Sequence, residues 1–156
     1  MEKVVWHKET RLEHPSNGTP VFGHMHEIKV PRGPTFSAAP IVLKYGEHFL
    51  NGSGFGFEHV WKAHFASITD HDEALTHIRN HVAACLNGVC TVFYERQGRL
   101  ETARFKVGNL ILQAYSRPDS HYSVVSGGYI RSGKGTLAHR FNPATPPPVI
   151  QNEKGP

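Results

Sequence analysis

The chain has 156 residues, of which 38% are hydrophobic, and carries a formal net charge of +4 with a pI near 9.2. This length suits a single domain, and the hydrophobic content excludes a wholly disordered chain. The mild basic excess is compatible with a phosphate-rich partner but does not identify one. No apolar run approaches the roughly 20 residues that a bilayer-spanning helix needs, and no signal-peptide pattern opens the chain, so we expect no membrane partner.

The first part of the chain is predicted to be an N-terminal extension over residues 1–35 that contains one strand. This strand covers residues 21–30 and is ended by the two prolines of residues 31–34. Residues 40–45, with the sequence PIVLKY, predict a second short strand. The glycine-rich residues 51–54 then predict a turn.

Two helices are expected after this turn. The first covers residues 57–66, and its helical spacing places His64 on the apolar face and both His59 and Lys62 on the opposite face. The second begins with Thr69 or Asp70 as its cap and ends at residues 87–88. Its apolar residues recur at helical spacing, namely Leu75, Ile78, Val82, Cys85 and Leu86.

Beyond the second helix the hydrophobic period changes to two. Strands are predicted over residues 91–96, 102–107, 110–115 and 121–126, with short turns between them. We therefore expect an α+β fold in which an antiparallel meander of four or more strands follows two helices. Residues 36–142 would form this domain, and residues 143–156 would form a proline-rich tail.

The first helix carries residues suited to cutting RNA without a metal. Such a reaction needs a base for the 2′-hydroxyl proton, an acid for the leaving oxygen and a cation for the phosphate. His59 and His64 suit the proton roles, and Lys62 suits the charge role. The alternative is that His64 is a hydrogen-bonded core histidine and His59 a surface one.

The meander offers a second group of candidate residues. Arg104 shares one predicted strand face with Lys106, and hydroxyl or aromatic side chains follow on later strands, namely Tyr115, Ser126 and Tyr129. Cations and aromatic rings on a sheet surface can bind phosphates and stack exposed bases. The alternative is an ordinary solvated sheet face.

Metal sites and disulfides receive weaker support from the sequence. His24 with His26, or His77 with His81, has a spacing that can hold zinc, but no further ligand follows at a typical distance. Cys85 and Cys90 are most simply interpreted as buried thiols, with a local disulfide as the alternative. We expect no metal and no cofactor.

Three segments together resemble a known group of nucleases. They are PIVLKYGEH from residue 40, GFGFEHVWKAHF from residue 54, and YSVVSGGY ending at residue 129. Their order resembles the phage- and toxin-associated nucleases of the barnase, EndoU, colicin and RelE-like superfamily over about residues 40–130. Gly56, His59 and His64 match the pattern Gly-x-x-His-Ile-x-x-x-His of that group, with Val60 in the isoleucine position.

The resemblance implies a metal-independent endoribonuclease that leaves a 2′,3′-cyclic phosphate. RNA, with tRNA as one candidate, would be the substrate, and a toxin member would have a cognate immunity protein. The protein would act in the cytoplasm, or be delivered into the cytoplasm of a target cell. The alternative is a non-catalytic protein that binds nucleic acid or neutralises a toxin.

The resemblance also implies roles for individual residues. It implies His59 or His64 as the acid/base residue, Lys62 and Arg104 as cations for the phosphate, and Ser126 and Tyr129 as groups that hold the phosphate or the base. With Tyr115 added from the meander, the candidate catalytic residues are His59, His64 and Ser126, and the candidate substrate-binding residues are Lys62, Arg104, Tyr115 and Tyr129. Gly127 and Gly128 separate Ser126 from its aromatic partner, which departs from the family pattern. If the first helix packs at the edge of the sheet, His64 can line the cleft while Val60 and Trp61 anchor the helix; if it packs flat, His59 is the better candidate. In either case we expect an imidazole of this helix and a cation or hydroxyl of the late strands to share one groove.

Overall fold

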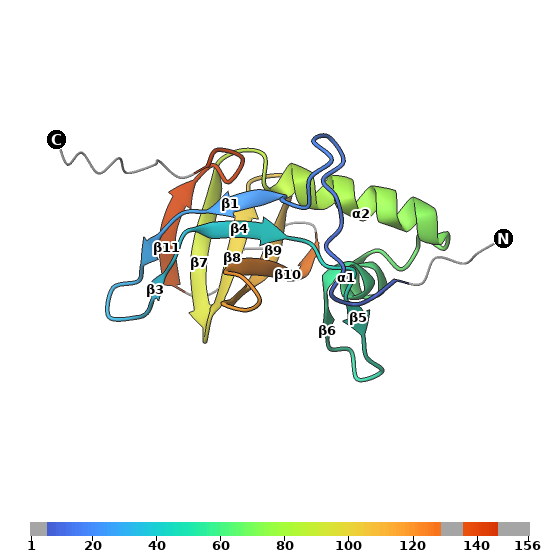
Figure 1. The fold of residues 1–156 in the computed structure, drawn as a ribbon, viewed down its shortest axis with the longest axis horizontal. Coiled ribbons are helices and arrows are strands. Elements are labelled where there is room, and N and C mark those ends of the chain that lie inside the picture. Colours follow the sequence, from blue (N-terminus) through green and yellow to red (C-terminus); the bar gives the residue numbers. More distant parts are fainter. Residues whose placement is uncertain (1–5, 129–135, 147–156) are drawn as a thin grey trace.

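The computed structural model of the chain describes residues 6–128 and 136–146, which form one large twisted sheet, two small hairpins and two helices (Figure 1). The sheet has seven strands in the order β1-β4-β10-β9-β8-β7-β11. They are β1 (Gly23–Met25), β4 (Ala39–Val42), β7 (Cys90–Arg96), β8 (Arg99–Arg104), β9 (Gly108–Tyr115), β10 (His121–Gly128) and β11 (Thr136–Phe141). Neighbouring strands are antiparallel except β4 and β10, which run parallel.

Two small hairpins lie outside this sheet. One pairs β2 (Ile28–Lys29) with β3 (Thr35–Phe36), and the other pairs β5 (Glu47–His48) with β6 (Gly54–Phe55). The second hairpin leads directly into the first helix, α1 (Gly56–His64), and projects from the body of the molecule in Figure 1.

The second helix, α2 (His71–Cys85), confirms the strongest sequence prediction. Asp70 is its N-cap, and the carboxylate of Asp70 accepts a hydrogen bond from the backbone N–H of Glu73 at 2.9 Å. Ala74, Ile78 and Val82 recur at helical spacing and are fully buried. No helix of the described residues is long and apolar enough to cross a membrane.

The core lies between α1, α2 and one face of the sheet. Alternate residues of the central strands point into it, among them Leu100, Leu110, Leu112 and Val124. Both cysteines are buried free thiols, as expected.

The opposite face of the central strands is polar. Cross-strand register aligns Arg99, Gln113 and Ser123, and it pairs Tyr115 with His121. We call this surface the polar face; its polar residues are Arg99, Glu101, Asn109, Gln113, Tyr115, His121, Ser123 and Ser126. Asn109 Nδ2 donates to Glu101 Oε2 at 2.6 Å, so these side chains also pair across strands.

The predicted fold class is wrong in two respects. The sheet is mixed rather than antiparallel, because the parallel pairing of β4 with β10 joins the meander β7–β10 to two further strands. In addition, six strands precede the helices, whereas the sequence predicted only two strands there and placed the sheet after the helices. Those strands have two to four residues, too few for a period of two to stand out in a sequence.

The predicted strand over residues 102–107 begins and ends too late. Gln97 and Gly98 both have positive φ, 42° and 80°, and form the two-residue turn from which β8 starts at Arg99. Lys106, with φ of 65°, lies in the next turn. Lys106 therefore does not share a strand face with Arg104.

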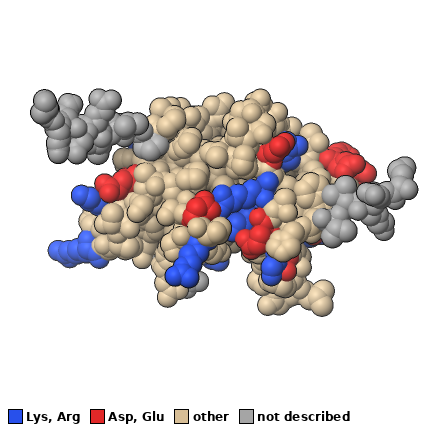
Figure 2. All heavy atoms as spheres, in the orientation of Figure 1, with Lys and Arg blue, Asp and Glu red and all other residues tan. Residues whose placement is uncertain are grey.

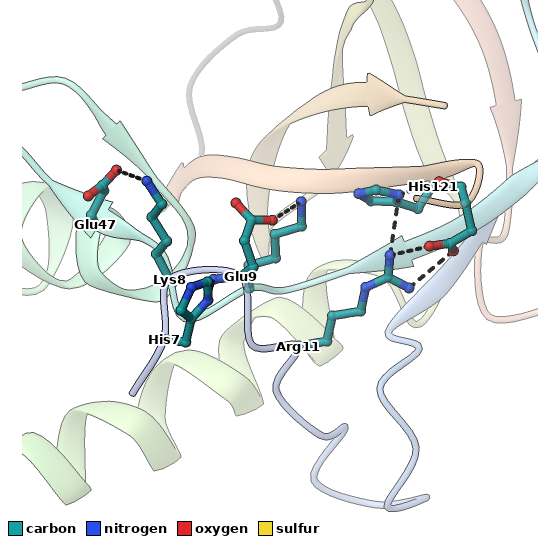
Figure 3. A network of polar contacts seen from close by, with 8 residues as sticks. His7, Lys8, Glu9, Arg11, Glu47 and His121 are labelled. Atoms are coloured by element: carbon teal, nitrogen blue, oxygen red, sulfur yellow. Dashed lines mark hydrogen bonds and ion pairs between the residues drawn. The ribbon is translucent and has the colours of Figure 1, made fainter. Parts of the chain in front are cut away.

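An N-terminal segment, residues 8–12, lies beside the chain that continues from β4. Its backbone exchanges hydrogen bonds with residues 43–46, including Leu12 N to Leu43 O at 2.8 Å and Tyr45 N to Thr10 O at 2.7 Å. Three ion pairs hold its side chains, as Figure 3 shows in part: Lys8–Glu47 at 3.5 Å, Glu9–Lys44 at 2.9 Å and Arg11–Asp119 at 2.6 Å.

Candidate active site at the end of strand β10

A histidine and a serine meet where α1 lies against β10. Strand β4 pairs with β10 at Tyr122 and Ser123, and α1 packs against β10. Nε2 of His64, the last residue of α1, lies 2.9 Å from Oγ of Ser126. The imidazole is exposed and the hydroxyl half-buried, so water and substrate can reach the pair.

Glycine at position 128 allows this approach. A Cβ atom on Gly128 would lie 3.1 Å from Nδ1 and 3.3 Å from Cγ of His64, so the ring rests against the strand backbone. The glycine pair that departs from the family pattern thus has a local role, because Gly128 leaves room for the imidazole beside Ser126.

A second glycine fixes the start of α1. Gly56 has φ of 75°, and a Cβ there would lie 2.4 Å from the carbonyl oxygen of Lys44. That same carbonyl accepts a hydrogen bond from Phe57 N at 2.9 Å. The glycine of the helix motif therefore lets α1 begin directly against the end of β4, which aims His64 at β10.

His59 lies on the buried side of α1. Its Nδ1 is 3.0 Å from Nδ1 of His48, which comes from the β5–β6 hairpin. Burial lowers the pKa of His59, and the neighbouring imidazoles of His48 and His64 lower it further. His59 is therefore a buried imidazole that resists protonation, five residues before the exposed His64 on the same helix.

The predicted faces of α1 are wrong for both histidines. His64 was expected on the apolar face and is exposed, whereas His59 was expected on the polar face and is buried. The helix packs at the end of the sheet, and the β5–β6 hairpin covers the side that carries His59. Helical spacing assigns residues to faces but does not reveal which face a separate hairpin will cover.

His81 is a further imidazole at this end of β10 that the sequence did not connect with the site. Its Nε2 lies 3.1 Å from the carbonyl oxygen of Gly128, and its ring packs edge-on against Phe65. Burial lowers the pKa of His81, and the charges of His77 and His64 act in the same direction. The only sequence signal was the His77–His81 spacing, which suggested a metal site instead.

Neither zinc-like histidine pair gathers a ligand set. A ring nitrogen of His26 lies 2.9 Å from the carbonyl oxygen of Thr145, and His81 faces Gly128. Among residues 6–128 and 136–146, no three histidine, cysteine, aspartate or glutamate side chains lie together as a metal site would require.

The two predicted phosphate-binding cations have other partners. Nζ of Lys62 lies 4.0 Å above the Trp61 ring on the exposed side of α1. Arg104 donates from Nη1 to the carbonyl oxygen of Ala84, near the C-terminal end of α2, and β9 separates its strand from β10. Lys62 and Arg104 therefore lie on different elements and have structural contacts of their own.

Tyr115 belongs to the polar face but not to the His64–Ser126 contact. It pairs with His121, which is five residues before Ser126 on β10, or about 15 Å along the strand. Tyr129 lies outside the described residues.

Lys44 is a cation of this surface that sequence reasoning missed. Only 5% of it is exposed, it pairs with Glu9, and its Nζ lies 4.6 Å above the Tyr115 ring. Lysine is almost never fully buried without a partner. Its position among the apolar residues of PIVLKY was the one sequence feature that could have indicated a buried lysine.

Comparisons with protein-family models, with curated proteins and with solved structures find no match for this chain. The resemblance to the nuclease superfamily therefore stays a hypothesis.

Proposed function

We propose that this chain is a metal-independent endoribonuclease in which His64 and Ser126 act on one phosphate. The observation that supports this is the 2.9 Å contact between His64 Nε2 and Ser126 Oγ at an exposed position, made by residues 62 apart in the sequence. A hydrogen-bonded imidazole and hydroxyl at an accessible surface are suited to proton transfer beside a bound phosphate.

In this proposal His64 carries the protons of the reaction. The 2′-oxygen of the ribose attacks phosphorus as its proton passes to the His64 imidazole, and the bond from phosphorus to the 5′-oxygen breaks as the His64 imidazolium gives that proton to the leaving 5′-oxygen. Ser126 Oγ, half-buried and held by His64, would hydrogen-bond to the phosphate. The product is a 2′,3′-cyclic phosphate.

His59 has a supporting role in this proposal. It is buried and paired with His48, so it can hold α1 and shape the electrostatic surroundings of His64 without touching substrate. The resemblance further suggests a toxin or phage-borne nuclease, with tRNA as a candidate substrate and an immunity protein as partner.

The test is cleavage of end-labelled single-stranded RNA and of tRNA by the purified chain in the presence of a metal chelator. We expect products with 2′,3′-cyclic phosphate ends, and a loss of activity of about 100-fold to 10,000-fold in His64→Ala. Ser126→Ala should also lose activity. His139→Ala is the matched control, because His139 is an exposed histidine on β11, at the far edge of the sheet.

Intact RNA in the wild-type reaction would overturn the proposal and favour a non-catalytic binding protein. Full activity in His64→Ala would also overturn it, since the reaction would then not depend on this imidazole.

A further inference from the structure

The polar face carries an exposed aromatic ring on a buried polar support. Tyr115 is 44% exposed, and its ring stacks on that of His121 with centroids 5.3 Å apart and planes 17° apart. Lys44 Nζ lies 4.6 Å from the centre of the Tyr115 ring. A cation and an imidazole thus hold the tyrosine ring in place while part of it faces solvent.

Strand β10, next to Tyr115, buries polar side chains that packing alone does not require. His121 and Ser123 are each 1% exposed, yet neither His121 Nε2 nor Ser123 Oγ has a hydrogen-bond partner among residues 6–128 and 136–146. Unpartnered buried polar atoms cost stability and need an explanation. Both stand on the same face of β10, on the strand that leads to Ser126.

Charge balance indicates what this surface would bind. Lys44 is neutralised by Glu9, and Arg11 by Asp119, so these four side chains together carry little excess positive charge (Figure 3). On the side of the molecule drawn in Figure 2, acidic groups likewise stand beside the central basic ones. A phosphate would meet Glu9 and Asp119 as competitors, whereas a nucleobase would meet an aromatic ring suited to stacking.

We propose that Tyr115, held by Lys44 and His121, is a stacking platform for a nucleobase of single-stranded RNA. The inference rests on the proposed nuclease function for the identity of its ligand. The platform lies about 15 Å along β10 from Ser126, a distance longer than one nucleotide. The stacked base therefore belongs to a nucleotide that does not flank the cut, so the platform increases affinity for longer RNA and leaves the chemical step unchanged.

The experiment measures binding and cleavage separately. Binding uses a labelled, non-cleavable 2′-O-methyl RNA of about ten nucleotides and fluorescence anisotropy. We expect Tyr115→Ala to weaken binding by about 5-fold to 100-fold, because base stacking contributes on this scale. Tyr115→Phe keeps the ring and should bind like the wild type.

Phe105→Ala is the matched control, because Phe105 is an 82% exposed aromatic residue in the β8–β9 turn. It should leave binding unchanged. For cleavage, Tyr115→Ala should raise KM for the longer RNA, keep kcat near the wild-type value, and leave kcat/KM for a dinucleotide unaltered.

Each outcome decides between the two proposals. Wild-type binding by Tyr115→Ala, or equal weakening by Phe105→Ala, overturns the platform whether or not RNA is cut. If the wild type binds RNA through Tyr115 but cuts none, the platform stands and the nuclease function falls. If the wild type does not bind RNA at all, both fall. Urea unfolding of Tyr115→Phe and Tyr115→Ala identifies any loss of fold.

Discussion

His48 and His59 face each other with their Nδ1 atoms 3.0 Å apart. One ring must carry its hydrogen on Nδ1 and the other must offer a lone pair there, so the contact fixes complementary tautomers. Protonating both rings would bring two N–H groups together and break the bond. The pair joins the β5–β6 hairpin to α1, the helix that ends at His64, and its integrity therefore bears on how α1 is held.

Acidification is expected to destabilise the fold. Burial is the largest cause of a lowered pKa at His59, His81 and His121, so each resists protonation in the folded chain relative to its ordinary value of 6.5. The unfolded chain takes up these protons first, and stability is therefore full above pH 6.5 and is lost as pH falls towards the lower folded-state pKa values. Urea unfolding across this range checks the slope, and a flat profile would contradict it.

Replacing each α1 histidine should separate stability from activity. His59→Ala leaves His48 without its partner and should reduce the free energy of unfolding by about 1–3 kcal/mol. His64→Ala removes an exposed ring and should change it by about 0.5 kcal/mol or less, while RNA cleavage is lost. Urea denaturation and cleavage measured on both variants give the comparison. A stable but inactive His59→Ala would reverse the assigned roles.

Arg104→Ala should affect folding rather than catalysis. Its guanidinium donates to the Ala84 carbonyl near the C-terminal end of α2, where a positive charge also complements the helix dipole. We expect a loss of about 1–2 kcal/mol in the free energy of unfolding, with cleavage per folded molecule unchanged. Should activity disappear while stability holds, Arg104 would be the phosphate ligand that the sequence suggested.

Gly56→Ala should lower the free energy of unfolding by more than the positive φ of this residue alone predicts. Gly52 and Gly56 both have positive φ, 88° and 75°, but a Cβ on Gly52 meets no atom of the described residues within 4 Å, whereas one on Gly56 meets the Lys44 carbonyl at 2.4 Å. Gly52→Ala should cost about 1 kcal/mol and Gly56→Ala more than about 2 kcal/mol. Urea denaturation of the two variants isolates the contact, and equal costs would show that α1 can shift away from Lys44.

The sequence predicted the elements whose signals are local. The cap and the buried stripe that includes Ile78 define α2 without tertiary information; the stripe is as predicted, and Asp70 is one of the two residues predicted as the cap. The sequence also led us to expect that an imidazole of the first helix and a hydroxyl of a late strand would meet, and His64 Nε2 lies 2.9 Å from Ser126 Oγ. It did not place α1, which packs against β10, an inner strand of the sheet rather than an edge strand.

What the sequence did not predict depends on contacts between distant segments. The parallel pairing of Ile41 with Tyr122 has no local signature, and it turns the meander into a mixed sheet. The burial of His59 depends on His48 from a hairpin whose strands have two residues each. Lys44 was predicted only as part of the strand over residues 40–45. Its role was missed because its partners, Glu9 and Tyr115, are far from it in the sequence.

Residues 8–12 form backbone hydrogen bonds with residues 43–46, and these bonds pair amides and carbonyls of residues 43–46 that would otherwise be unpaired. Shortening the chain to begin at residue 36 would remove these bonds together with β1, the outer neighbour of β4. The trimmed product would present a ready template for joining a second copy strand to strand. We therefore expect the shortened chain to self-associate rather than to form a smaller active domain.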